Sequence, residues 1–103
     1  MKQGEIWYVD LNPIKESEQA GLRQVVIVSG NLMNTYLNVV ICCPLTTKVK
    51  NYKGNVVLTP SAANNLDAPS EILTFHIHSI SKERLIRKMG IISKSELQQI
   101  HLG

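Results

Sequence analysis

The sequence predicts a mainly β fold: a small, strongly bent barrel that ends in a C-terminal α-helix. From residue 5 to residue 92, apolar alternation and β-branched runs dominate, and no 3.6-residue period lasts long enough for a major helix. The segments Val25–Val28 and Val39–Cys43 are continuously apolar, which is typical of central strands that are covered on both faces or closed into a barrel. A chain of 103 residues has room for one domain, which we expect to span residues 1–103.

Turn-forming residues divide the chain into six predicted strands and one short helical turn. Asn, Gly and Pro cluster between the apolar runs, at residues 12–13, 29–31, 51–54 and 64–69. The helical turn is expected at Asn31–Tyr36. The predicted strands are Glu5–Leu11, Gln24–Ser29, Asn38–Pro44, Asn55–Leu58, Glu71–Ser79 and Leu85–Ile91.

A capping box predicts the C-terminal helix. Ser93 is placed to cap the first turn, and Glu96, three residues later, to bond back to the backbone of Ser93. Leu97, Ile100 and Leu102 follow at spacings that let the helix pack against the sheet.

Composition narrows the class of protein. Hydrophobic residues make up 44% and charged residues 18% of the chain, which excludes a disordered or collagen-like protein. No apolar run approaches the roughly 20 residues that span a bilayer, and the N-terminus lacks a signal-peptide core, so we expect a cytoplasmic protein without membrane contact. The absence of a Gly-rich phosphate loop and of G-x-S-x-G and H-E-x-x-H motifs argues against nucleotide hydrolysis and the common hydrolases.

Positive charge is concentrated in two segments of this chain, whose formal net charge is +3. Two basic patches on a small domain favour a polyanionic partner, nucleic acid first, although a solvated lysine-rich surface explains the same pattern. The segments contain Lys48, Lys50 and Lys53, and then Lys82, Arg84, Arg87 and Lys88.

The only two cysteines, Cys42 and Cys43, are adjacent. Neighbouring positions on a strand point to opposite faces, so the pair suits neither a loop-closing disulfide nor a tetrahedral metal site. We expect both to be small buried apolar residues.

Two segments contain candidate phosphate ligands. The long polar segment at residues 12–23 ends in Arg23, where a guanidinium beside a rigid strand suits bidentate binding of a phosphate; a salt bridge to Glu18 or Asp10 is the alternative. Thr46 and Thr47 leave a buried strand, and their hydroxyls suit either phosphate oxygens or a cap on the following loop.

His76 and His78 occupy alternate positions of the predicted fifth strand, so both rings are expected on one face. Three readings stay open. The pair could ligate a metal if a third ligand came from elsewhere, share acid and base roles in RNA cleavage, or be partly buried and hydrogen-bonded.

Several blocks, in order along nearly the whole chain, resemble the MazF/PemK family of toxins. The opening blocks are GEIWYVDLNP at residues 4–13 and KESEQAGLR at residues 15–23, and the later ones are PLTT at 44–47 and SISKERL at 79–85. The resemblance implies an SH3-like barrel of the MazF/PemK/CcdB type with a C-terminal helix, assembled as a homodimer. This fold agrees with the one predicted from the residues.

The resemblance also implies a function. Members are toxins of type II toxin–antitoxin pairs. They are sequence-selective mRNA interferases that cleave single-stranded RNA at short sequences without a metal or other cofactor. The ribose 2′-hydroxyl attacks the adjacent phosphate and leaves 2′,3′-cyclic phosphate and 5′-hydroxyl ends. A cognate antitoxin protein blocks the site, and operator DNA is bound only through that antitoxin.

The motifs match the family's functional residues to positions of this chain. Arg23 and Thr46 match the catalytic positions: Arg23 would stabilise the transition-state charge and Thr46 would hold a phosphate oxygen. Proposals for the family also give the arginine acid or base work, but an arginine, with a pKa above about 12, is a poor base. Charge stabilisation is therefore the role assigned to it, and the group that transfers protons stays open. The implied substrate-binding residues are Ser17, Glu18, Gln19, Thr47, Lys48, His76 and His78.

Three positions depart from the family pattern. Glu16 replaces a usual glycine, Gln24 replaces the proline that usually follows the arginine, and His76-Ile77-His78 stands where many members have Gln-x-Arg. Glu16 adds negative charge, the histidines remove a permanent positive charge, and the loss of both Gly and Pro changes the conformational freedom of the loop, so weakened RNA cleavage stays open. Two other readings also stay open: a CcdB-like toxin that binds DNA gyrase without being an enzyme, and a non-catalytic RNA- or DNA-binding barrel.

Overall fold

The computed structural model describes residues 1–10 and 22–102, with the side chains of Leu22, His101 and Leu102 excepted. Two short 3₁₀ turns, η1 (Thr74–His76) and η2 (Lys82–Arg84), interrupt the strands. In chain order the other elements are β1 (Glu5–Asp10), β2 (Leu22–Ile27), α1 (Asn31–Tyr36), β3 (Val39–Thr46), β4 (Val56–Leu58), β5 (Ser70–Ile72), β6 (His78–Ser81), β7 (Leu85–Ile91) and α2 (Lys94–Leu102).

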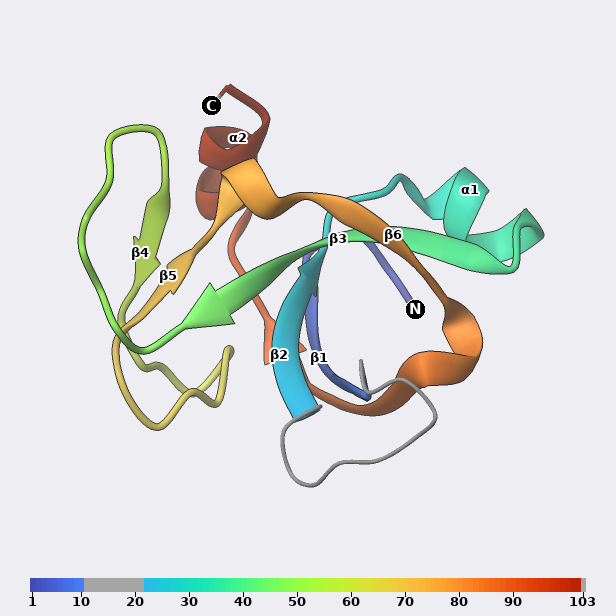
Figure 1. Cartoon of the computed structure of the whole chain (residues 1–103), viewed down its shortest axis with the longest axis horizontal. Helices are drawn as coiled ribbons and strands as arrows, with labels where there is room; N and C mark the ends of the chain where they lie inside the picture. The colour runs from blue at the N-terminus through green and yellow to red at the C-terminus, as the bar shows by residue number, and fades with distance from the viewer. Residues whose placement is uncertain (11–21, 103) are drawn as a thin grey trace.

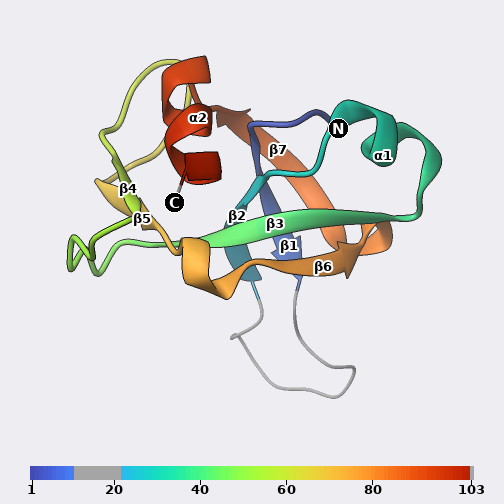
Figure 2. The same cartoon turned by 90° about the horizontal axis from the view of Figure 1, so that it is seen from above.

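The strands form one antiparallel sheet that bends into a barrel-like shape (Figures 1 and 2). The strand order is β4-β5-β3-β2-β1-β7, and β6 pairs with the other end of β3. Within the described residues this hydrogen-bonded path does not close on itself. The predicted fold class, mainly β with a C-terminal helix, is confirmed. None of the helices in the described part of the chain is long and apolar enough to cross a membrane.

The central strands bury apolar side chains on both faces, as the continuous apolar runs predicted. One cluster includes Ile6, Val26 and Cys43, and the cluster on the other face includes Val25 and Cys42. The neighbouring cysteines therefore enter different cores, and both are free thiols. Burial raises the pKa of Cys42 to about 12, with a further contribution from Cys43, and burial raises the pKa of Cys43 to about 11. Both thiols therefore stay protonated and act as apolar residues.

Helix α2 begins at the predicted capping box. The backbone N–H of Ser93 donates to Glu96 Oε1 at 2.8 Å, and the backbone N–H of Glu96 donates to Ser93 Oγ at 3.0 Å. Ile100 is buried in the same core as Ile6, and Leu97 packs against that core, so the helix closes one face of the sheet. The predicted packing of the Leu102 side chain lies outside the described residues.

The predicted strand Glu71–Ser79 is wrong in one respect: it is two strands, β5 and β6, separated by η1. Both pair with β3, but His78 lies six positions after Ile72, whereas their partners Cys42 and Leu45 are three positions apart. The extra residues are accommodated by the 3₁₀ turn. The alternation of side chains between the two faces of a strand is therefore interrupted here, and His76 and His78 do not share a strand.

Candidate active site

An open pocket of about 300 Å³ lies where β2 begins and the antiparallel strand β3 ends. The register of the two strands pairs Val25 with Pro44. Two residues back along β2 and two residues forward along β3, the same register places Arg23 opposite Thr46, although the two are far apart in sequence. The pocket is lined by Tyr8, Arg23, Gln24, Leu45, Thr46 and Thr47.

Arg23 presents a guanidinium that is available to a ligand. The side chain is exposed, and within residues 1–10 and 22–102 no carboxylate forms an ion pair with it. The predicted alternative, a salt bridge to Asp10, is therefore wrong. The other predicted partner, Glu18, lies outside the described residues, as do Ser17 and Gln19.

Thr46 is the last residue of β3 and is half-buried. Its Oγ1 accepts the backbone N–H of Lys48 at 3.1 Å, so the predicted capping role is confirmed. A hydroxyl that accepts one bond still has its own hydrogen to donate, for example to a phosphate oxygen. Thr47 also lines the pocket, whereas Lys48 is exposed just beyond it.

The loop that follows Thr46 is anchored by a buried carboxylate, Glu71, which lies opposite Thr46 in the sheet and is 0% exposed. Burial opposes its ionisation and raises its pKa, but a hydrogen bond from Asn55 and backbone N–H bonds from Lys50, Tyr52 and Asn51 outweigh this and hold the pKa at about 2. These bonds are 2.7–3.0 Å long. The charged carboxylate thus fixes the lysine-rich loop beside the pocket.

Tyr8 is a pocket residue that sequence reasoning missed. It lies opposite Gln24 on the neighbouring strand, and Gln24 Nε2 donates to its hydroxyl at 3.3 Å. Pairing of the first two apolar runs would have indicated it, because the register that places Ile6 opposite Val26 places Tyr8 opposite Gln24. Gln24, which the sequence marked only as a departure from the family pattern, is thereby also part of the site.

His76 and His78 are not brought to this pocket within one chain. His78 pairs with Cys42, four residues back along β3 from Thr46, a distance of about 13 Å at the rise of a strand. Both residues are exposed, so the burial expected for them is wrong, whereas the expected hydrogen bonding is present at His78. His78 Nδ1 lies 2.8 Å from the carbonyl oxygen of His76. In the described part of the chain no three His, Cys, Asp or Glu residues group as metal ligands.

The chain is similar to known proteins over nearly its whole length. The chain is 30% identical to Endoribonuclease MazF of Staphylococcus saprophyticus over 98% of its own length and 85% of that protein. It is 32% identical to Endoribonuclease MazF9 of Mycobacterium tuberculosis over 97% of its own length and 89% of that protein. Neither relative favours the gyrase-binding alternative.

The fold is shared with solved structures. A mycobacterial endoribonuclease in complex with its cognate antitoxin matches with a TM-score of 0.76 at 20% identity, over 99% of this chain and 86% of that one. The family model for the PemK-like, MazF-like toxin of type II toxin–antitoxin systems matches residues 2–103. The chain therefore belongs to the PemK-like, MazF-like toxin family.

Proposed function

We propose that the protein is the endoribonuclease toxin of a type II toxin–antitoxin pair and that it cleaves single-stranded RNA without a metal. The observation that carries this proposal is that Arg23 and Thr46 line one open pocket. The family match and the two relatives named as endoribonucleases support it. RNA as the substrate implies a cytoplasmic site of action.

The proposed reaction is an internal phosphoryl transfer. The ribose 2′-oxygen forms a bond to the adjacent phosphorus, the bond from phosphorus to the 5′-oxygen breaks, and the 2′-hydroxyl loses a proton while the leaving 5′-oxygen gains one. Arg23 stabilises the extra negative charge on the phosphoryl oxygens, and Thr46 donates a hydrogen bond to one of them. The products are a 2′,3′-cyclic phosphate and a 5′-hydroxyl.

The other predicted substrate-binding residues differ in where they lie relative to the Arg23 pocket. Thr47 lines the pocket, and Lys48 follows it on the loop that Glu71 anchors. His76 lies in η1, and His78 lies in β6 opposite Cys42, away from the Arg23 pocket. They therefore contact RNA only where the RNA extends beyond the reacting phosphate. Ser17, Glu18 and Gln19 remain proposals carried by the family motif.

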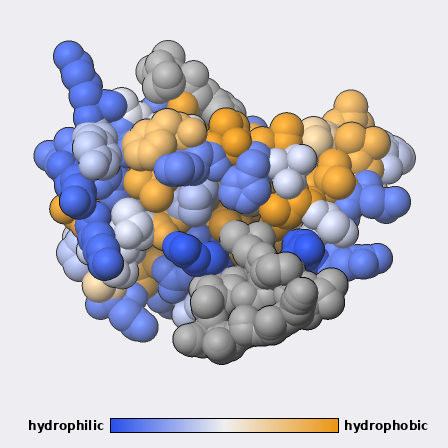
Figure 3. Space-filling model, viewed as in Figure 1, coloured by the Kyte–Doolittle hydropathy of each residue, from blue (hydrophilic) through white to orange (hydrophobic). Residues whose placement is uncertain are grey.

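A second copy of the chain is the proposed partner for an apolar face beside α2. A groove of about 390 Å³ is lined by Phe75, Ile77 and Ile100, among others. Phe75 and Ile77 are 58% and 54% exposed in the single chain, and Tyr52 packs edge-on against Phe75. Apolar residues gather on this side of the molecule, over the upper part of the view in Figure 3. Exposed apolar surface of this kind is typical of a subunit interface, which supports the homodimer.

The proposed antitoxin has an acidic, partly apolar segment. Lys48, Lys50 and Lys53 are exposed on the anchored loop, and Arg23 is exposed in the pocket. A disordered acidic tail that folds along this surface pairs its carboxylates with these cations, while its apolar residues supply the remaining affinity.

Co-expression with the product of the neighbouring small open reading frame should therefore give a stable complex, rescue growth and stop RNA cleavage. Salt should weaken the complex only in part, because apolar contacts are not screened. If no neighbouring product binds, and expression of the protein alone leaves growth and cellular RNA intact, the toxin function is wrong for this chain.

A further inference from the structure

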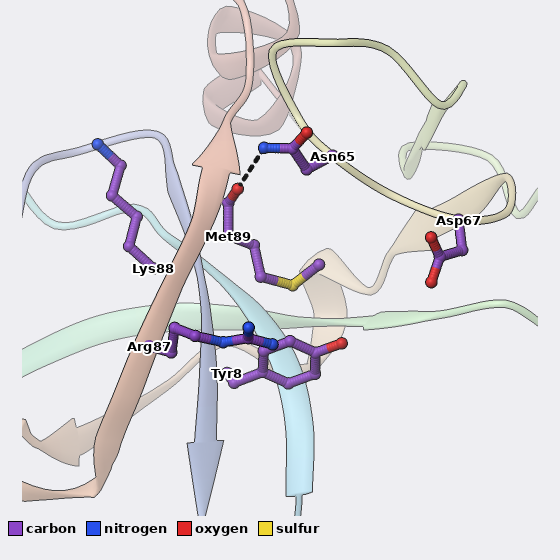
Figure 4. A pocket seen from close by; sticks show the side chains of 6 residues that line it. All are labelled: Tyr8, Asn65, Asp67, Arg87, Lys88 and Met89. Carbon is purple, nitrogen blue, oxygen red and sulfur yellow. Dashed lines mark hydrogen bonds between the residues drawn. The ribbon is translucent and has the colours of Figure 1, made fainter.

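A second pocket, of about 320 Å³, shares Tyr8 with the Arg23 pocket, and Figure 4 shows the residues that line it. Strands β1 and β7 and the loop between β4 and β5 form it. Its lining residues are Tyr8, Asn65, Asp67, Arg87, Lys88 and Met89. Nothing in the proposed reaction uses this pocket.

Arg87 supplies the pocket with a fixed positive charge. Its guanidinium carbon lies 4.9 Å from the centre of the Tyr8 ring, and Figure 4 shows the group lying across that ring. Stacking on an aromatic face holds a guanidinium in place without neutralising it, so its N–H groups remain available to a phosphate. Lys88 instead points away and forms an ion pair with Glu5 at 3.2 Å. No carboxylate of the described residues pairs with Arg87.

Asp67 places a carboxylate across the opening from Arg87 (Figure 4). The side chain is exposed and makes no hydrogen bond or ion pair within the described residues. Its loop is held firmly: Asn64, which is buried, accepts the backbone N–H groups of Ser61 and Leu66, and Asn65 Nδ2 donates to the Met89 carbonyl at 2.8 Å. Within the described residues the carboxylate is thus an unengaged acceptor on an anchored loop, available to the hydrogen-bond donors of a ligand.

The backbone of β7 lets this loop approach closely. A Cβ added at Gly90 would lie 2.4 Å from the carbonyl oxygen of Ala63, which is closer than side chains tolerate. The backbone N–H of Ile91 also donates to that oxygen, at 3.0 Å. Glycine at this position therefore permits the packing that brings Asp67 to the same pocket as Arg87.

Tyr8 connects the two pockets. It lines both of them, and its ring stacks against the Arg87 guanidinium. Its hydroxyl accepts a hydrogen bond from Gln24, which lines the Arg23 pocket. Because Tyr8 lines both, the two pockets are adjacent.

From this arrangement we infer that the Arg87–Asp67 pocket is a nucleotide subsite that binds the residue next to the cleaved bond and prefers guanine. The inference rests on the proposed function. Arg87 binds the flanking phosphate, and the Asp67 carboxylate accepts hydrogen bonds from the base. Among the four RNA bases, guanine presents two adjacent donors, N1–H and the N2 amino group, which match two carboxylate oxygens. Readout of an unpaired base on its Watson–Crick edge is the usual mode for single-stranded RNA.

The test compares four proteins on a randomised single-stranded RNA pool: wild type, Arg87→Gln, Asp67→Asn, and Lys94→Gln as a control that removes an exposed lysine of α2 outside the pocket. Wild type should favour guanine at one position flanking the cut by about tenfold. Asp67→Asn should bring that ratio close to one. Circular dichroism and urea unfolding establish that each variant is folded.

Arg87→Gln tests the phosphate contact. KM for one defined RNA should rise about 5- to 20-fold with kcat nearly unchanged. For an uncleavable RNA with a 2′-deoxyribose at the cut, the slope of log affinity against log salt should become shallower by about 0.7, the change expected for one phosphate contact. Lys94→Gln should change neither quantity.

The outcomes separate this inference from the proposed function. If wild type cleaves no RNA, the proposed function fails. If wild type cleaves RNA but shows no guanine preference beside the cut, or if Asp67→Asn and Arg87→Gln match wild type, the inference alone is overturned. It is also overturned if Arg87→Gln weakens antitoxin binding while KM for RNA is unchanged, because the pocket then serves a protein.

Discussion

Replacing Arg23 by alanine is expected to lower RNA cleavage at least a hundredfold while leaving the fold intact. Loss of one donor to the transition state typically costs roughly 2.7–4 kcal/mol. The side chain is exposed and has no partner in the described part of the chain, so the folded state loses little without it. Single-turnover cleavage of a labelled RNA measures the rate, and urea unfolding measures the stability.

Two further variants sharpen this result. Arg23→Lys keeps the charge but not the bidentate geometry, so it should recover only part of the lost rate. Thr46→Ala should cost less than Arg23→Ala because it removes a single neutral donor, although it also removes the acceptor for the Lys48 N–H. Equal cleavage by wild type and Arg23→Ala would refute the site.

Glu71→Gln should give the second large effect, on both stability and activity. A neutral amide cannot accept the set of bonds that the buried carboxylate receives, so the loop after Thr46 should lose its anchor. Small displacements of a catalytic site can cost up to about a hundredfold in rate, and we expect a loss of at least tenfold. Glu83→Gln, at an exposed position of η2, is the matched control and should change stability by less than about 0.5 kcal/mol.

The same carboxylate predicts a pH dependence. Because its pKa is held at about 2 in the folded protein against an ordinary value of 4.5, its ionisation stabilises the folded state above pH 4.5. That contribution is lost as the pH falls from 4.5 towards 2. The stability difference between wild type and Glu71→Gln should therefore be largest at neutral pH and shrink at pH 3, as urea unfolding can measure. A difference that stays constant over this range would contradict the role given to the charge.

The elements that the sequence predicted well are those with a local cause. The capping box at Ser93 and Glu96 satisfies its own backbone groups, and the apolar runs at Val25–Val28 and Val39–Cys43 need burial on both faces wherever they lie. The break at Thr74–His76 has no such cause. It arises because β5 and β6 pair with two separate stretches of β3, and that mismatch exists only once the strands are paired.

The same distinction holds for the site. Arg23 and Thr46 were identified by motif, and their meeting follows from the β2–β3 register. Tyr8 and Asp67 could not be found in this way. Tyr8 becomes a site residue through its cross-strand neighbours Gln24 and Arg87, and Asp67 through a loop that docks on β7 at Gly90.

Cleavage of a labelled single-stranded RNA in excess EDTA, with analysis of the new ends, tests the central claim most directly. The account predicts that cleavage continues and that the products carry 2′,3′-cyclic phosphate and 5′-hydroxyl ends. A requirement for Mg²⁺ or Zn²⁺, or 5′-phosphate ends, would contradict it. A zinc requirement abolished by substituting both His76 and His78 would favour the metal reading of that pair instead.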